Sequence, residues 1–337
     1  MTTRGTVTAA LLLALAAVLG AVLWMAVQLD RMRLEPLVLA CDPETLVLEP
    51  GTSFAQLAER LTHRGWVEHP RALRLYARAT GLAGSIQAGE YAVEPGMSLA
   101  DLLAAMAAGE VRSHSLTVVE GWTYRELLAA VAAEPAISHT LGEVSGEQLM
   151  EQLGHPDQHP EGRFLPETYR FPRGTTDLQF LGRAYQAMQR ALQGEWRDRA
   201  PDLPYETPYQ ALIMASIIEK ETGVAAERPQ IAGVFVRRLR RGMRLQTDPT
   251  VIYGLGEAFD GDLRYRDLRQ DTPYNTYTRG GLPPTPIALP GRAAIHAALH
   301  PADGDALYFV SRGDGSHVFS ATLEEHNRAV RRYQKGR

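Results

Sequence analysis

The feature that most limits how this chain can fold is an uncharged, apolar run from Ala9 to Val27. As a helix, about nineteen apolar residues are long enough to cross the hydrocarbon core of a bilayer. A cleaved signal peptide has a shorter apolar run followed closely by small residues at a cleavage site, and residues 28–31 offer no such site. The sequence therefore predicts a permanent membrane-spanning helix.

The composition indicates a globular chain of two or three modest domains, because it has 337 residues of which 45% are hydrophobic. Its net charge of -4 argues against a nucleic-acid-binding protein, which carries a strong basic excess. No phosphate-binding or dinucleotide-binding glycine motif is present, so no cofactor is expected.

The single cysteine, Cys41, excludes an internal disulfide and a multi-cysteine metal site. His300, His317 and His326 lack the close helical spacing of a zinc motif, so no metal site is predicted.

A helix that begins at Thr207 and Pro208 is predicted to be buried. A hydroxyl N-cap followed by proline is a typical helix start. Residues 211–218 are apolar on every side, which is typical of a helix inside a domain. Its end carries three charged residues and then two residues expected to close the helix: Glu219, Lys220, Glu221, Thr222 and Gly223.

Glu219 is the predicted general acid. The residues three and four positions earlier, Ser216 and Ala215, are small and leave room for a ligand beside its carboxyl group. Burial and the negative end of the helix dipole raise the pKa of a carboxyl group placed there, whereas Lys220 opposes the rise. Glu221 lies about 200° around the helix from Glu219, so the two cannot act on one bond. The alternative is that both acids are exposed residues of a last turn.

Five further residues combine the groups that bind sugars. A sugar presents hydroxyl edges and apolar ring faces together, and amide, carboxylate and aromatic side chains suit both. With no charged-cofactor motif, carbohydrate is the expected ligand. The predicted substrate-binding residues are Gln246, Asp248, Tyr274, Asn275 and Tyr277, with Glu221 added.

Several long, ordered motifs resemble those of the YceG-like endolytic murein transglycosylases, and the resemblance runs from the membrane segment to the C-terminus. By this resemblance Glu219 matches the catalytic glutamate of the family. Arg237 departs from the usual Asn, Thr285 from the usual Gly and Glu167 from the usual Asp. The motifs are Glu219 to Thr222, Glu227-Arg228, Met243 to Gly254, Tyr274 to Tyr277 and Gly281 to Pro284.

The resemblance implies a lytic transglycosylase that cleaves the MurNAc-GlcNAc bond of nascent peptidoglycan, forms 1,6-anhydro-MurNAc ends and limits glycan strand length. It implies peptidoglycan strands as the substrate and cell-wall synthases as partners. It also implies a single-pass inner-membrane location with the catalytic domain on the periplasmic side. Two alternatives stay open: a membrane-anchored glycan-binding scaffold, and a lysozyme-like hydrolase in which Asp248 supplies a second carboxylate.

The N-terminal half contains one pattern three times: a short strand, a glycine turn, a hydroxyl N-cap and a Gln, Asp or Glu three residues later. This spacing predicts capping boxes at Ser53, Ser98 and Thr123. Small modules of this kind resemble LysM-like domains, which bind peptidoglycan glycan. The alternative is a spacer without a ligand.

The C-terminal part is predicted to hold a hairpin around Gly313 to Gly315 and a final helix. The basic run Arg237 to Arg241 is interpreted as the solvated face of a helix, or as a contact for peptide-stem carboxylates. Glu161 and Glu167 are expected either to line the cleft or to fix a turn.

The predicted fold class is α+β. The predicted order of segments is cytoplasmic tail 1–8, transmembrane helix 9–28, tether 29–44, LysM-like module 45–134, connection 135–160 and catalytic domain 161–337.

Overall fold

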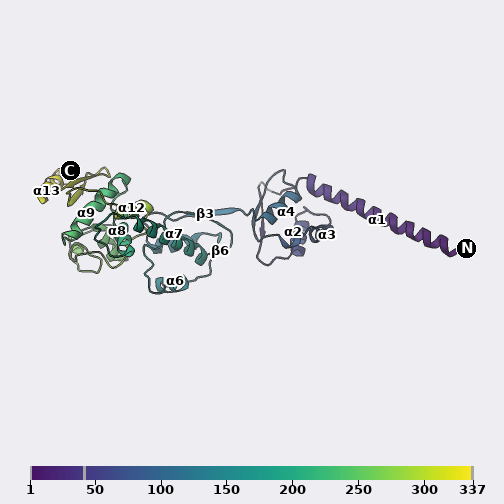
Figure 1. Cartoon of the computed structure of the whole chain (residues 1–337), viewed down its shortest axis with the longest axis horizontal. Coiled ribbons are helices and arrows are strands. Elements are labelled where there is room, and N and C mark those ends of the chain that lie inside the picture. Colours follow the sequence, from purple (N-terminus) through teal and green to yellow (C-terminus); the bar gives the residue numbers. More distant parts are fainter. Residues whose placement is uncertain (1, 41–42, 335–337) are drawn as a thin grey trace. The chain divides into compact units, whose positions relative to one another are not determined.

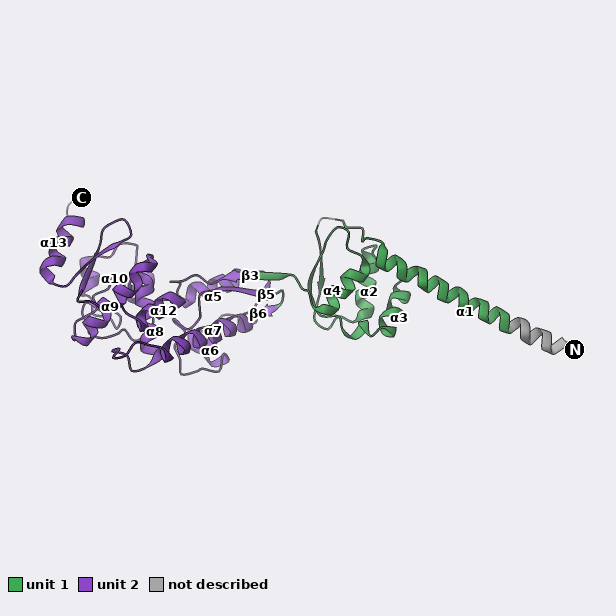
Figure 2. Ribbon diagram, turned by 45° about the horizontal axis from the view of Figure 1, so that its top comes forward, with its two compact units in different colours: residues 1–114, 172–174 green, residues 115–171, 175–337 purple. Residues whose placement is uncertain are grey.

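The computed structural model of the chain describes residues 2–40 and 43–334 (Figure 1). It divides into two compact units, which are coloured separately in Figure 2. Unit 1 consists of residues 1–114 and 172–174, and unit 2 of residues 115–171 and 175–337. Cys41, the single cysteine of the chain, lies outside the described residues.

A single long helix, α1 (Thr2–Leu34), opens unit 1. From Leu11 to Leu34 it is apolar enough and long enough to cross a membrane, and none of this stretch is buried against protein. The predicted span at 9–28 thus lies within one continuous helix, which also takes in the first residues of the predicted tether.

The rest of unit 1 is a small mixed domain built on two antiparallel strands. β1 (Glu44–Leu48) pairs with β2 (Gly89–Val93), so that Leu46 lies opposite Tyr91. Both of those side chains are buried, and helices packed on the strands complete an apolar core. The helices of this unit are α2 (Phe54–His63), α3 (Pro70–Ala79), the 3-10 turn η1 (Leu82–Gly84) and α4 (Leu99–Ala108).

All three predicted capping boxes are confirmed, at Ser53, Ser98 and Thr123. In each, the hydroxyl accepts a hydrogen bond from the third backbone N–H of the helix, and the side chain of that third residue accepts one from the cap N–H. The third box begins α5 (Tyr124–Ala133), which belongs to unit 2. The division between the units therefore falls at residue 114, not at the predicted boundary of 134.

Unit 2 is built around α8 (Pro208–Glu221), whose residues 211–218 are all buried. Four helices pack against it, which explains why its sequence has no polar face: α7 (Asp177–Arg197), α9 (Arg228–Arg240), α10 (Asp248–Leu255) and α12 (Arg292–Leu299). Thr207 caps the helix and Pro208 occupies its first turn, as predicted. The other helices of unit 2 are α6 (Gly146–Gln152), η2 (Ala225–Glu227), η3 (Gly256–Ala258), α11 (Tyr265–Arg269) and α13 (Leu323–Tyr333).

The remaining strands form short two-stranded sheets. The predicted C-terminal hairpin is confirmed, with Phe309 opposite Phe319 across the pair. These sheets pair β3 (Ser113–Thr117) with β5 (Thr168–Pro172), β4 (Ile137–Ser138) with β6 (Thr175–Thr176), and β7 (Tyr308–Ser311) with β8 (His317–Ser320).

Two local predictions are corrected. α8 ends at Glu221 with Thr222 in an extended conformation, and Gly223 does not adopt the left-handed conformation of a C-terminal cap. The basic run on α9 is not a uniformly solvated face, because Arg238 is only 7% exposed. Arg237 is half-buried and donates hydrogen bonds to the carbonyl groups of Ala302 and Ala306. Both side chains therefore have structural roles.

Candidate active site

The side chains of Glu219 and Glu221, both in the last turn of α8, contact different parts of unit 2. The Oε1 atom of Glu219 lies 3.1 Å from Nη2 of Arg228, and its Oε2 accepts a hydrogen bond of 2.8 Å from the backbone N–H of Gly291. Gly291 is the N-cap of α12, so the carboxylate sits at the positive end of that helix. With a side chain only 4% exposed, Glu219 joins α8 to α9 and α12.

The sequence left open whether burial or Lys220 decides the pKa of Glu219; in the structure that pKa is raised, and burial is the main cause. The nearby carboxylate of Glu120 raises it further, while the Gly291 N–H and Arg228 lower it. The predicted free space beside the carboxyl group is not seen at its oxygens, because both are occupied by protein donors.

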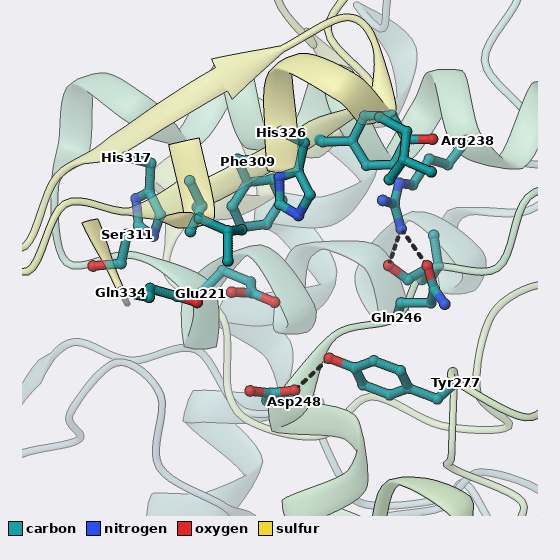
Figure 3. A pocket seen from close by; sticks show the side chains of 15 residues that line it. Glu221, Arg238, Gln246, Asp248, Tyr277, Phe309, Ser311, His317, His326 and Gln334 are labelled. Carbon is teal, nitrogen blue, oxygen red and sulfur yellow. Dashed lines mark hydrogen bonds between the residues drawn. The ribbon is translucent and has the colours of Figure 1, made fainter. Parts of the chain in front are cut away.

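Glu221 lines a cavity of about 410 Å³ (Figure 3). The same cavity is lined by three of the predicted substrate-binding residues, Gln246, Asp248 and Tyr277. It lies between the end of α8, the loop before α10 and the C-terminal hairpin. The other residues that line it are Arg238, Leu245, Tyr308, Phe309, Val310, Ser311, His317, Leu323, His326, Val330 and Gln334.

The carboxyl group of Glu221 has the acidity of a general acid at neutral pH. Burial raises its pKa from 4.5 to about 7, and the negative charge of Asp248 contributes to the rise. The hydroxyl of Thr247, which donates a hydrogen bond to Oε1, lowers it, as do His317 and Arg238. Because Thr247 engages Oε1, the second oxygen is the one available to a ligand.

A set of buried threonines holds this donor in place. The Oγ1 of Thr276 accepts a hydrogen bond of 3.1 Å from the backbone N–H of Thr247. Thr250 donates from its Oγ1 to the Thr247 carbonyl at 2.8 Å and lies 2.9 Å from the Thr276 hydroxyl. All three residues are almost completely buried. The position of the Thr247 hydroxyl is therefore fixed before any ligand arrives.

Two predicted ligand-binding residues, Gln246 and Asp248, lie at the N-terminal end of α10. Asp248 accepts a hydrogen bond from the Tyr277 hydroxyl, drawn as a dashed line in Figure 3. Gln246 is exposed and has a φ of 53°, a left-handed conformation that is uncommon for residues other than glycine. Backbone strain of this kind is concentrated at ligand sites, where the surrounding structure maintains it.

Asn275, predicted as a substrate-binding residue, is buried and is not among the residues that line this cavity. Its side chain is 0% exposed. The amide nitrogen donates to the carbonyl groups of Asp267, Leu268 and Gln270, and the amide oxygen accepts from the Tyr277 N–H at 2.8 Å. It is a structural residue that orients the cavity-lining tyrosine.

Tyr274 is also absent from the residues that line this cavity. Its hydroxyl lies 2.9 Å from the Thr285 hydroxyl, and its ring packs edge-on against Tyr253. Tyr253 in turn donates to the buried Glu161, whose pKa burial raises to about 7. Glu161 also accepts from the Tyr124 N–H, so its carboxyl group links the start of α5 to α10 and does not line this cavity.

Comparison with known proteins decides the family. The model of the YceG-like family matches residues 46–332. This chain belongs to the YceG-like family. A crystal structure of a YceG-like protein from Listeria monocytogenes is similar to it, with a TM-score of 0.54 and 30% sequence identity over 86% of this chain and 99% of the Listeria chain.

Sequence relatives cover a shorter part of this YceG-like chain. A Bacillus subtilis protein named endolytic murein transglycosylase is 41% identical over 177 residues, which are 52% of this chain and 49% of that protein. A Streptococcus pneumoniae protein of the same name is 32% identical over 176 residues, 50% of this chain and 31% of that protein. The matched regions thus span half or less of these relatives.

The structure adds residues to the YceG-like site that sequence reasoning missed. Arg238 donates from Nε to the Leu307 carbonyl and from Nη1 to the Leu245 carbonyl, at 2.6 and 2.8 Å. His317 pairs through Nδ1 with Glu227 at 2.7 Å, and both side chains are largely buried. The one sequence signal for this pair was the Glu227-Arg228 motif. His317 itself could not be predicted, because it lies in a hairpin about 90 residues further along the chain.

Proposed function

We propose that this YceG-like chain is an endolytic lytic transglycosylase of peptidoglycan in which Glu221 is the single acid and base. The observation that carries the proposal is the position of Glu221, with a pKa near 7, in the cavity that also gathers Gln246, Asp248 and Tyr277. The relatives named endolytic murein transglycosylase support the choice of substrate and reaction.

In the first step, protonated Glu221 donates its proton to the oxygen of the bond between MurNAc and GlcNAc. The bond from C1 of MurNAc to that oxygen breaks through an oxocarbenium-like state, and GlcNAc leaves with a free hydroxyl group. In the second step, the Glu221 carboxylate takes the proton of the C6 hydroxyl of the same MurNAc. The C6 oxygen then attacks C1, which closes the 1,6-anhydro ring and restores the protonated acid. Cleavage within nascent strands in this way limits their length.

Glu221 is preferred to Glu219 because a general acid needs an oxygen within reach of the substrate. Both oxygens of Glu219 are held, one by Arg228 and one by Gly291. Moving Glu219 to a substrate would leave the Arg228 guanidinium without that partner in a largely buried place. The sequence-based assignment of Glu219 is therefore replaced in this proposal, and Glu219 is a positioning residue.

Asp248 supports one competing function, that of a lysozyme-like hydrolase. It lines the same cavity as Glu221 and is close enough for its charge to raise the pKa of that group. Two carboxylates flanking one bond could activate water and release an ordinary reducing end instead of an anhydro sugar. The products distinguish the two reactions.

The test is digestion of purified murein by the full chain in detergent, with products weighed by mass spectrometry. We expect muropeptides with 1,6-anhydro ends, about 18 Da lighter than hydrolysed ones because no water is added. Glu221→Gln should reduce turnover by a factor on the order of 100 to 10,000 while circular dichroism shows a folded chain. Glu219→Gln is the matched variant and should retain more activity per folded molecule. Reducing ends without the mass loss would contradict the transglycosylase, and an active Glu221→Gln would contradict the assignment of the acid.

We also propose that α1 anchors the chain in the inner membrane in a single pass, with both units on the periplasmic side, near the cell-wall synthases. The LysM-like character of unit 1 belongs to this proposal, supported by its strand-helix-helix-strand order between β1 and β2. Glu221→Gln chains should cosediment with murein, and removal of residues 44–108 should weaken that binding. If Glu221→Gln fully replaced the wild-type chain in cells while the deletion did not, the chain would be a glycan-binding scaffold.

A further inference from the structure

A cluster of two imidazoles and one carboxylate lies outside the proposed active site. Glu195 comes from the last turns of α7, His296 from α12, and His300 is the residue that caps the C-terminus of α12. One ligand atom of each side chain lies within 4.8 Å of those of the other two. We propose that these three residues form a binding site for a divalent transition-metal ion of the zinc type.

The distances suit such an ion. Nδ1 of His296 lies 2.8 Å, and Nε2 of His300 3.7 Å, from the same oxygen of Glu195, Oε2. In a tetrahedral zinc site with bonds of about 2.0–2.1 Å, neighbouring ligand atoms are about 3.3–3.4 Å apart. The two separations from the glutamate oxygen lie on either side of this value, each within about half an ångström or slightly more of it. One nitrogen of each imidazole also lies within 4.8 Å of that of the other.

The arrangement of the rings also favours a shared cation. His296 and His300 are four residues apart, and their rings are stacked with centroids 4.3 Å apart. A metal ion takes both rings in the neutral form and the carboxylate as an anion, so each of the three groups has a partner.

The chemistry of the ligands selects the class of ion. Two imidazole nitrogens and one carboxylate oxygen suit zinc, nickel, cobalt and copper, whereas magnesium and calcium prefer oxygen ligands. The side chains are 32% (Glu195), 58% (His296) and 30% (His300) exposed, so an ion can enter from solvent and complete its coordination with water. Such an ion would tie the end of α7 to the end of α12.

The site does not belong to the proposed reaction. The cavity that holds Glu221 has none of these three residues in its lining. The bound metal would therefore stabilise the fold of unit 2 without taking part in cleavage. The test of the metal site is independent of the test of the transglycosylase, because metal binding is measured without murein.

The experiment is calorimetric titration of Zn²⁺ into the full chain, purified in detergent without a polyhistidine tag and freed of metal by a chelator. A Cys41→Ser background removes the one thiol that could bind zinc elsewhere. We expect about one ion per chain, an increase in the melting temperature with added Zn²⁺, and loss of both when a chelator is added in excess. His296→Ala, Glu195→Gln and His300→Ala should each weaken binding at least tenfold, since loss of even an outer-shell partner typically costs about 10–100-fold.

His139→Ala is the matched control, because His139 is an exposed histidine outside the cluster. It should leave the zinc affinity unchanged. His296→Ala is the decisive variant if His300→Ala lowers stability by itself, because His296 is the more exposed ligand. The proposal is overturned if the wild-type chain shows no binding near one equivalent, or if His296→Ala binds as tightly as the wild type. In either case the cluster is an ordinary ion pair between histidine and glutamate.

Discussion

Glu219 Oε1 lies 3.1 Å from Arg228 Nη2, and this ion pair fixes the last turn of α8 to the first residue of α9. Arg228 also lies 3.7 Å from Glu120, whose side chain is about half exposed. The pair is largely buried, with side-chain exposures of 11% for Arg228 and 4% for Glu219. The turn that carries Glu221 is thus held in position by its neighbour on the other side of the helix.

Replacing Arg228 by methionine should destabilise the chain by about 3–5 kcal/mol near neutral pH, because it leaves the Glu219 carboxylate buried without its cation. Urea unfolding monitored by circular dichroism measures the loss. The double variant Arg228→Met, Glu219→Gln should recover part of it, since the unpaired charge is then gone. A single variant as stable as the wild type would show that the pair has no structural role.

The rate of cleavage should fall as pH rises through about 7, because the proposed acid must be protonated and the pKa of Glu221 is raised to about 7 by burial. The measurement is kcat/KM for murein fragments between pH 5 and pH 9. The residual activity of Glu221→Gln should not show this alkaline limb. A decline centred near 4.5, the ordinary value for glutamate, would mean that Glu221 is solvated and is not the acid.

Glu221 should also make stability depend on pH, in a definite direction. The folded chain keeps this proton up to about pH 7, whereas the unfolded chain releases it near 4.5. Between these values unfolding releases a proton, so the free energy of unfolding decreases as pH rises. Relative to Glu221→Gln, the wild type should lose about 3 kcal/mol between pH 4 and pH 8.

The comparison with Glu221→Gln is needed because burial also raises the pKa of Glu161 to about 7, and that group contributes a similar dependence to both chains. Urea unfolding of the two chains at each pH gives the difference. A difference that stays constant with pH would contradict the raised pKa of Glu221.

Asn275→Ala should destabilise the chain by about 2–4 kcal/mol, because the buried carbonyl groups of Asp267, Leu268 and Gln270 lose a donor and the Tyr277 N–H loses an acceptor. Thermal and urea unfolding measure the loss. Asn327→Ala, at an exposed position in α13, is the control and should change the free energy of unfolding by less than about 0.5 kcal/mol. An unchanged stability together with a raised KM would instead restore Asn275 as a substrate contact.

Local signals in the sequence predicted much of the fold. Hydroxyl caps with a reciprocal partner three residues later located three helix starts, because that geometry is contained within four residues. The burial of α8 could also be predicted locally, because its residues 211–218 present no polar face. The boundary between the units could not be predicted this way, since the third repeat has the same local pattern as the first two and differs in what it packs against.

The site was harder to predict, because the roles of Glu219 and Glu221 depend on residues far along the chain. The helical spacing correctly separated the two carboxyl groups. The Gly291 N–H binds Glu219, and the Thr247 hydroxyl binds Glu221 at the cavity. Neither contact can be predicted from the sequence of α8. Arg238 likewise reads as one of several surface arginines until the carbonyl groups of Leu245 and Leu307 are seen around it.

Because consecutive residues of a helix differ by about 100° and 1.5 Å, α8 cannot change its length without misplacing both acids at once. One amino acid inserted before Glu219 would rotate its carboxylate away from Gly291 and carry Glu221 out of the cavity in the same step. Evolution can therefore exchange side chains along this helix, but insertions and deletions must accumulate in the loops around it.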